Sequence, residues 1–224
     1  PEGNNKIRLE TAAGLVVAEV CSNDNSVEWT RLENVPAYVA AQDIPVTLPE
    51  FGEVKVDVAF GGNYFATVPW NGKNLRVGPE NGKQFRELGR LVREQVAEKV
   101  TISHPTHSHI RYPSDNTDLL VTFWHEPDQP TSMYRNVHVL SAGLLDRSPG
   151  GTGTSAMMAM FEARGDMKVG ETIQSEGLLG SGVFEGSLLR ETKLGGERAV
   201  VPTVKGTAKV IGYAKWLLDP NDAV

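Results

Sequence analysis

Short runs of apolar residues, many of them alternating with polar ones, dominate the chain and predict β-strands. In residues 53–60, Val54, Val56, Val58 and Phe60 recur at every second position, so they share one face of an extended segment. Runs of the same kind predict further strands at 6–9, 14–20, 27–32, 35–40, 64–68, 119–123, 136–140, 183–190, 199–204 and 207–213.

Two segments instead have the spacing of helices. Residues 83–100 place apolar side chains three or four positions apart with charges between them, which is typical of a helix with one solvated face. Residues 152–164 are small or apolar on nearly all sides, and Gly165 follows where a helix commonly ends. Such a helix is usually buried. The pattern therefore predicts an α+β protein with a mixed or antiparallel sheet wrapped around a central helix.

The amino-acid composition argues against several classes of protein. The chain has 22 Lys and Arg against 28 Asp and Glu, a net charge of −6, which argues against a general nucleic-acid binder. The single cysteine, Cys21, excludes an internal disulfide and Cys-rich zinc sites, and it favours a reducing, cytoplasmic compartment. No apolar run approaches the roughly 18 residues that cross a bilayer, so we expect no membrane partner.

The stretch from Asp146 to Ala156 carries the candidate chemistry. It reads Asp-Arg-Ser-Pro-Gly-Gly-Thr-Gly-Thr-Ser-Ala and leads into the second helix. Consecutive glycines let backbone N–H groups converge, and a helix N-terminus adds partial positive charge, so a carboxylate or phosphate could bind there. Asp146 could accept from a ligand ammonium, as an amino-acid site requires. A turn that binds nothing and caps the helix through Thr152 or Thr154 explains the pattern equally well.

Other motifs are weaker. A relaxed Gly-x-Gly-x-x-Ala pattern begins at Gly151, but a lone match of this kind does not support nucleotide binding. His104, His107 and His109 could share a metal ion. No carboxylate pattern accompanies them, and a polar loop or strand edge is the preferred interpretation. Cys21 is interpreted as a small buried or half-buried residue.

The 146–156 stretch resembles the signature of the proline racemase family, which includes 4-hydroxyproline 2-epimerases and trans-3-hydroxyproline dehydratases. Further matches cover most of the chain, in family order. They lie at 8–16, 60–66, 103–106, 135–137, 206–208 and 218–220. The chain looks like the C-terminal two-thirds of a protein of this family.

The resemblance implies a diaminopimelate-epimerase-like fold, in which two lobes face each other across a cleft. Each lobe wraps a sheet around a central helix. Residues 1–195 would then form the second lobe, which carries the signature. Residues 196–224 would supply strands that return to a first lobe largely missing from this chain. A homodimer is also an expectation.

The resemblance also implies a cofactor-free and metal-free reaction at the Cα of proline or hydroxyproline. One cysteine from each lobe would remove or return the Cα proton. Asp146 would bind the ring nitrogen, and the amides of Gly151 and Thr152 would hold the carboxylate where negative charge develops. Leu140 stands where racemases often have a pocket Phe.

Two departures from the family pattern bear on activity. Gly150 occupies the position of the second-lobe catalytic cysteine, and glycine has no side-chain proton to transfer. The first-lobe cysteine of a Met-Cys-Gly-His-type motif is absent, and Cys21 is not its counterpart. Two-base racemisation is therefore not expected, and this chain alone is expected to be inactive. Three alternatives stay open: a one-base dehydratase or proton-exchange catalyst when full length, a natural or engineered inactivating change at Gly150, and a binding remnant that retains the imino-acid site.

Overall fold

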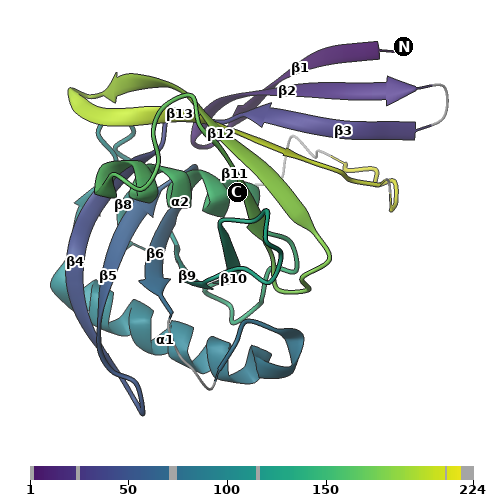
Figure 1. The fold of residues 1–224 in the computed structure, drawn as a ribbon. Helices are drawn as coiled ribbons and strands as arrows, with labels where there is room; N and C mark the ends of the chain where they lie inside the picture. The colour runs from purple at the N-terminus through teal and green to yellow at the C-terminus, as the bar shows by residue number, and fades with distance from the viewer. Residues whose placement is uncertain (1–2, 24–25, 71–74, 115–116, 210, 218–224) are drawn as a thin grey trace.

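Thirteen strands and two long helices make up most of the chain (Figure 1). The computed structural model describes residues 3–23, 26–70, 75–114, 117–209 and 211–217. Within these ranges the elements are β1 (Gly3–Thr11), β2 (Gly14–Asn23), β3 (Ser26–Glu33), β4 (Tyr38–Leu48), β5 (Gly52–Phe60), β6 (Tyr64–Pro69), the 3₁₀ turn Pro79–Asn81, α1 (Gly82–Lys99), β7 (Ile102–Ser103), β8 (Arg111–Tyr112), β9 (Leu119–His125), β10 (Tyr134–Val139), α2 (Gly151–Arg164), β11 (Thr172–Glu176), β12 (Val183–Leu194) and β13 (Glu197–Gly206).

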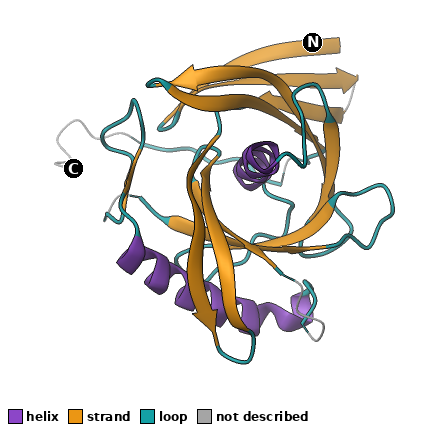
Figure 2. Ribbon diagram, turned by 60° about the vertical axis from the view of Figure 1, so that its left-hand side comes forward, coloured by secondary structure: helices purple, strands orange, loops and turns teal. Residues whose placement is uncertain are grey.

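Eleven of these strands form one mixed sheet. Its order is β1-β2-β3-β13-β12-β11-β10-β9-β6-β5-β4, and only the β10/β11 and β6/β9 pairs are parallel among the described strands. From β13 to β4 the sheet curves around α2, which Figure 2 shows nearly end-on inside the strands. Two backbone hydrogen bonds of 2.8 Å join Ala37, just before β4, to Val200 of β13. The curved part of the sheet is therefore almost closed on itself, which confirms the predicted α+β lobe with a central helix.

The central helix α2 is buried along most of its length. Ala156, Met157 and Met158 are fully enclosed, and the side chains around them come from strands on several sides. Small and flexible apolar residues suit this position because the sheet surrounds the helix and leaves little room. Gly165 ends the helix with a positive φ of 84°, as its place in the sequence predicts.

The other helix, α1, lies on the outside of the curved sheet (Figures 1 and 2). Phe85, Val92 and Val96 are fully buried on its inner face. Its outer face carries charged residues, of which Arg90 pairs with both Glu87 and Glu94. The predicted amphipathic helix at 83–100 is thus confirmed, with bounds shifted by one residue.

β1, β2 and β3 extend away from the lobe as a three-stranded wing (Figures 1 and 2). The wing joins the rest of the sheet through β3, which pairs with the end of β13. Among the described residues no helix packs against the wing, and β1 is exposed along nearly its whole length. Ile7, Leu9 and Leu15 are each almost half exposed. The wing therefore presents solvent-exposed apolar side chains on its sheet surface.

Two features of the sheet differ from the pattern in the sequence. Strand β11 was not predicted, because Thr-Ile-Gln-Ser-Glu contains a single apolar residue. The strand predicted at 207–213 is wrong: residues 207–209 and 211–213 belong to no helix or strand, and residue 210 lies outside the described residues. Ile211 and Tyr213 are almost fully exposed, so the apolar run has no neighbouring strand to pair with.

The expected division between residues 1–195 and 196–224 stays a prediction. β13, which belongs to the second segment, is hydrogen-bonded to β12 and to β3. Val200 and Val204 of β13 belong to the apolar cluster around α2. The last residues of the second segment, 218–224, lie outside the described residues.

Candidate active site at the start of the central helix

The segment that precedes α2 folds back along β10. The Asp146 amide donates to the His138 carbonyl at 3.0 Å, and Val139 bridges Leu145 in the antiparallel sense. Residues 146–150 are thereby placed beside the end of β10 and directly before the helix. Their position depends on backbone pairing rather than on a flexible linker.

Asp146 is half-buried and anchors this segment. Its Oδ1 accepts two hydrogen bonds of 2.9 Å from Ser148, one from the amide and one from the hydroxyl. The Ser148 hydroxyl oxygen accepts in turn from the Gly150 amide at 3.1 Å. The second carboxylate oxygen, Oδ2, faces Gly150, since a Cβ built on that glycine would lie 3.5 Å from it. One oxygen of Asp146 therefore organises the turn while the other faces the start of α2.

The first turn of α2 has backbone donors without helical partners and no side-chain cap. Gly150 precedes the helix with a φ of +75° and a ψ of 118°, and the first helical hydrogen bond runs from the Thr154 amide to the Gly150 carbonyl at 2.9 Å. The amides of Gly151 and Thr152 lie in the turn whose N–H groups have no carbonyl partner within the helix. No side-chain cap hydrogen bond is present, so the expected cap through Thr152 or Thr154 is not formed, while the alternative that this turn binds nothing stays open. The geometry fits an anion such as a carboxylate.

A second turn of the chain packs against this helix start, and sequence reasoning did not foresee it. A Cβ on Gly61, in the turn between β5 and β6, would lie 2.3 Å from the Thr152 carbonyl oxygen and 2.5 Å from the Ala156 nitrogen. The Asn34 side-chain amide donates to the Gly61 carbonyl at 2.7 Å and to the Ser155 hydroxyl at 3.0 Å. In the sequence, the run Gly61-Gly62-Asn63 indicates a turn but does not reveal its contact with the helix.

His138 lies beneath the same helix start. Its ring is 1% exposed and stands edge-on to Phe65 at 5.3 Å. Nε2 donates to the Pro149 carbonyl at 2.7 Å, and Nδ1 accepts from the Thr122 hydroxyl at 2.7 Å. Burial lowers the pKa of His138, so the ring is neutral. The expectation that His138 is a hydrogen-bonded strand residue is confirmed.

Four of the five predicted site residues lie in one contiguous segment, and the fifth, Leu140, lies in a nearby turn. Asp146, Gly150, Gly151 and Thr152 lie in a single turn-to-helix segment. Leu140 follows β10 and belongs to a tight turn closed by bonds of 2.9 Å from its amide to Leu144 and from Gly143 to its carbonyl. Their roles toward a ligand stay predictions.

The other candidate side chains lie elsewhere. The rings of His104 and His107 are 4.7 Å apart and those of His107 and His109 are 5.6 Å apart. Burial lowers the pKa of His104 to about 4. In the part of the chain that the structure describes, no group of three or more His, Cys, Asp or Glu residues could hold a metal ion. Cys21 is half-buried on the wing and donates to Glu28, as expected of a structural cysteine.

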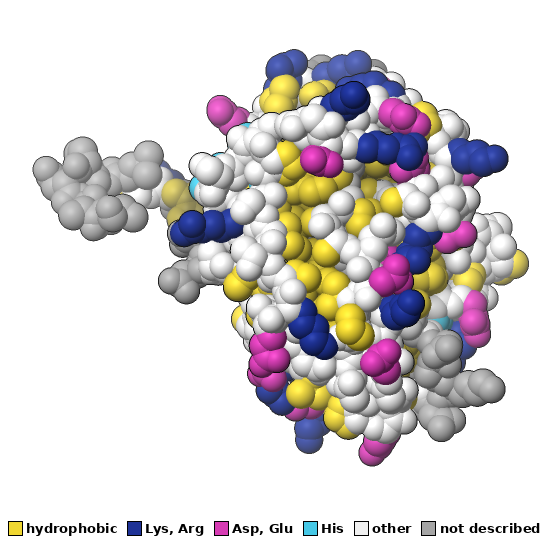
Figure 3. All heavy atoms as spheres, turned by 90° about the vertical axis from the view of Figure 1, so that its left-hand side faces the viewer, with side chains coloured by type: hydrophobic (Ala, Val, Ile, Leu, Met, Phe, Trp, Pro, Cys, Tyr) yellow, Lys and Arg dark blue, Asp and Glu magenta, His cyan; other side chains and the backbone are white. Residues whose placement is uncertain are grey.

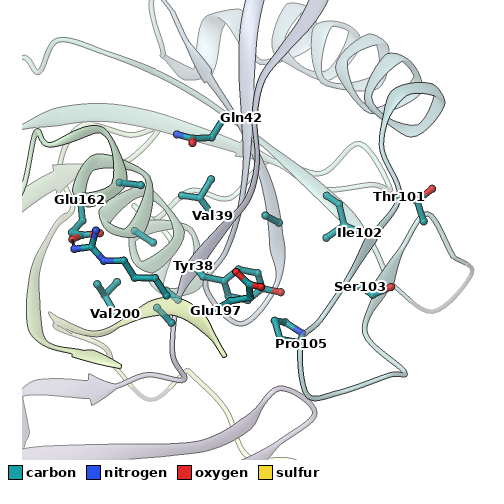
Figure 4. A pocket seen from close by; sticks show the side chains of 16 residues that line it. Tyr38, Val39, Gln42, Thr101, Ile102, Ser103, Pro105, Glu162, Glu197 and Val200 are labelled. Atoms are coloured by element: carbon teal, nitrogen blue, oxygen red, sulfur yellow. Dashed lines mark hydrogen bonds and ion pairs between the residues drawn. The ribbon is translucent and has the colours of Figure 1, made fainter. Parts of the chain in front are cut away.

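A cavity of about 450 Å³ opens at the other end of α2 (Figure 4). Tyr38, Gln42, Glu162 and Glu197 are among the side chains that line it, and the segment 146–152 contributes none. Since α2 rises about 1.5 Å per residue, Glu162 is roughly 16 Å along the helix from Gly151. Figure 3 shows the β4 side of the molecule, where apolar side chains gather and charged ones surround them. This cavity is separate from the candidate site.

The fold and the site together define the class of protein. A sheet wrapped around a helix whose glycine-rich N-terminus faces outward is a lobe of the diaminopimelate-epimerase-like type. Two solved structures share it. One is a probable proline racemase from Agrobacterium radiobacter K84 with bound carbonate, at a TM-score of 0.86 and 33% identity, covering 99% of this chain and 63% of that one. The other is a hydroxyproline epimerase from Agrobacterium vitis with bound trans-4-hydroxy-L-proline, at a TM-score of 0.83 and 32% identity, covering 92% and 57%.

The chain belongs to the proline racemase family, whose model matches residues 1–224. A 4-hydroxyproline 2-epimerase of Cereibacter sphaeroides strain ATCC 17029 is 57% identical over all 224 residues. The chain spans 65% of the length of that epimerase. No helix among the described residues is long and apolar enough to cross a membrane.

Proposed function

We propose that this chain is the imino-acid-binding part of a cofactor-independent enzyme that acts at the Cα of proline or hydroxyproline. The observation that carries the proposal is the first turn of α2, where two backbone amides without helical partners lie beside a half-buried carboxylate. Membership of the proline racemase family supports it, as does the bound trans-4-hydroxy-L-proline in the Agrobacterium vitis epimerase.

In the proposed site each group has a chemical task. The amides of Gly151 and Thr152 hold the substrate carboxylate, onto which negative charge spreads when the Cα proton leaves. Asp146 Oδ2 accepts a hydrogen bond from the ring ammonium. Both groups are held by backbone bonds and by Ser148, so little reorganisation is needed as charge develops. Leu140 would contribute an apolar wall.

The glycine at position 150 removes one of the two proton-transfer groups that racemisation requires. The family resemblance implies a catalytic side chain of the second lobe at this position, and glycine supplies no acid or base. In this proposal, proton removal falls to a group other than the side chain at position 150. A single base that removes and returns the proton on one face gives isotope exchange without inversion. With a 3-hydroxyproline, the same base starts β-elimination: the Cα proton and the hydroxyl leave as water, and a Cα–Cβ double bond forms.

The test uses the intact protein in D₂O with L-proline, trans-4-hydroxy-L-proline and trans-3-hydroxy-L-proline. NMR follows loss of the Cα proton signal, and chiral chromatography detects epimers or dehydrated product. We expect exchange with at least one of the three. Absence of exchange and of product with all three would overturn the enzymatic proposal.

A binding protein without turnover is the second candidate, and the glycine at position 150 favours it. Calorimetry with pyrrole-2-carboxylate, a planar mimic of the deprotonated substrate, separates the two. Binding without exchange supports the second candidate. No binding and no exchange would contradict both. The expected homodimer stays a prediction.

A further inference from the structure

The imidazole of His138 fills the space into which a side chain at position 150 would project. A Cβ built on Gly150 would lie 2.4 Å from His138 Cδ2 and 2.5 Å from Nε2. Real Cβ atoms do not approach other heavy atoms so closely, because the contact lies far inside van der Waals distance. The glycine at 150 and the histidine at 138 are therefore sterically linked.

The ring is not free to move aside. Both nitrogens are hydrogen-bonded at 2.7 Å, to Thr122 on one side and to Pro149 on the other. Gly153 encloses the ring from the next turn, since a Cβ there would lie 2.2 Å from His138 Cε1. Rotating the ring away would leave buried polar atoms without hydrogen-bond partners, which is energetically unfavourable. The first turn of α2 is thus built over this imidazole.

We propose that His138 is a positioning residue of the site, which holds the Pro149 carbonyl and thereby the start of α2 while excluding any side chain at position 150. The missing side chain at position 150 and the imidazole of His138 then form a matched steric pair. Restoring cysteine at 150 alone does not restore a competent second-lobe acid, because the histidine stands in its place.

His138 is not itself the missing acid or base. Its Nε2–H is committed to Pro149, its Nδ1 is occupied by Thr122, and the ring is buried. A group that exchanges a proton with a substrate must reach it within hydrogen-bond distance. His138 therefore acts through the backbone of Pro149 and Gly150.

A double-mutant cycle on the intact protein tests the steric half of the proposal. The variants are Gly150→Cys, His138→Ala and the two combined, with His138→Val as a second choice if alanine prevents folding. We expect Gly150→Cys to lower the melting temperature by roughly 2–4 °C more when His138 is present than when it is absent. The positive φ of Gly150 disfavours cysteine in both backgrounds, so that cost cancels in the cycle.

Gly151 provides the matched control, because a Cβ at that position meets nothing within 4 Å. Gly151→Cys should cost the same melting temperature with and without His138. An equal cost for Gly150→Cys in the two backgrounds would overturn the proposal.

The claim that His138 positions the start of α2 for ligand binding rests on the proposed function, and a separate binding measurement tests it. Calorimetry with pyrrole-2-carboxylate should show an affinity at least tenfold weaker for His138→Ala. The control is Leu188→Ala in β12, a buried residue of the same lobe whose amide bonds to the Glu171 carbonyl beyond the C-terminal end of α2, and its affinity should match the wild type. An equal loss in both variants would overturn the positioning role. If the wild type binds nothing, the proposed function fails while the melting-temperature cycle still tests the steric pair.

Discussion

The two ends of α2 differ in how their polar groups are satisfied. At its C-terminal end, Arg164 donates to both carboxylate oxygens of the buried Asp57, at 2.6 and 2.7 Å, and Gly165 closes the last turn. At its N-terminal end, backbone amides are left without helical partners, no side chain caps them, and glycines keep the surface bare. We call the C-terminal end, with Arg164 and Gly165, the closed end, because its ion pair fixes the helix in the sheet. We call the N-terminal end, from Gly150 to Thr152, the open end, because its amide donors are left for a ligand. Four predictions test this difference, from the largest expected effect to the smallest.

The largest loss of stability is expected at the closed end. Arg164→Met leaves the Asp57 carboxylate buried without its charge partner, which should lower the free energy of unfolding by about 3 kcal/mol. Denaturant unfolding measures the loss, and ligand affinity should not change. The control is Arg90→Met on α1, whose ion pairs with Glu87 and Glu94 are exposed and should contribute less than about 1 kcal/mol. Equal losses for the two variants would refute the role of the closed end.

Gly61→Ala should disturb both stability and binding at the open end. The added methyl group would press on the Thr152 carbonyl, and overpacking of this kind costs about 1–3 kcal/mol. Because the displaced atoms belong to the first turn of α2, the affinity for pyrrole-2-carboxylate should fall as well. Gly212→Ala is the control, since a Cβ there meets nothing within 4 Å. A Gly61→Ala protein with normal stability and affinity would contradict the observed contact.

Asp146→Asn should reduce binding with little effect on folding. The amide retains an oxygen that can accept from Ser148 but loses the charge that attracts a ring ammonium. A charged hydrogen bond contributes about 1.5–3 kcal/mol, so affinity for trans-4-hydroxy-L-proline should fall at least about tenfold. Asp166→Asn, just beyond the closed end, should bind like the wild type. Calorimetry that finds equal affinities for the two variants would remove Asp146 from the site.

The smallest effect is a difference in pH dependence between the two ends. Burial lowers the pKa of His138 from its usual 6.5, so the unfolded chain takes up a proton that the folded chain excludes, and stability falls as pH drops below about 6.5. Between pH 7.5 and 5.5 this amounts to about 1 kcal/mol. The Arg164 pKa is raised by its bonds to Asp57, so the closed end adds no such dependence.

Denaturant unfolding of the wild type and of His138→Val at these two pH values measures the difference. The variant should lose about 1 kcal/mol less than the wild type on acidification. An identical pH dependence in the two proteins would show that His138 is not held neutral beneath the open end.

Much of the fold could be predicted from local patterns. The small and apolar composition of 152–164 predicted a buried helix, and the structure places α2 inside the sheet. Strand β11 could not be predicted from apolar alternation, because its two fully buried residues, Ser175 and Glu176, are polar. Glu176 accepts hydrogen bonds from the amides of Asp128 and Gln129, contacts that no alternation of apolar residues reveals. The strand expected at 207–213 failed for the opposite reason, since an apolar run needs a neighbour to pair with.

The candidate site divides in the same way. The residues from Asp146 to Thr152 are contiguous, so the sequence by itself determined that an acidic side chain and glycine-rich amides stand together before a helix. It also showed that position 150 has no side chain. Only the tertiary structure decided that His138 occupies the adjoining space and that Gly61 presses on the same turn. These contacts join residues 12 and about 90 positions apart, and their distances are set by the packing of β10 and the β5–β6 turn around α2.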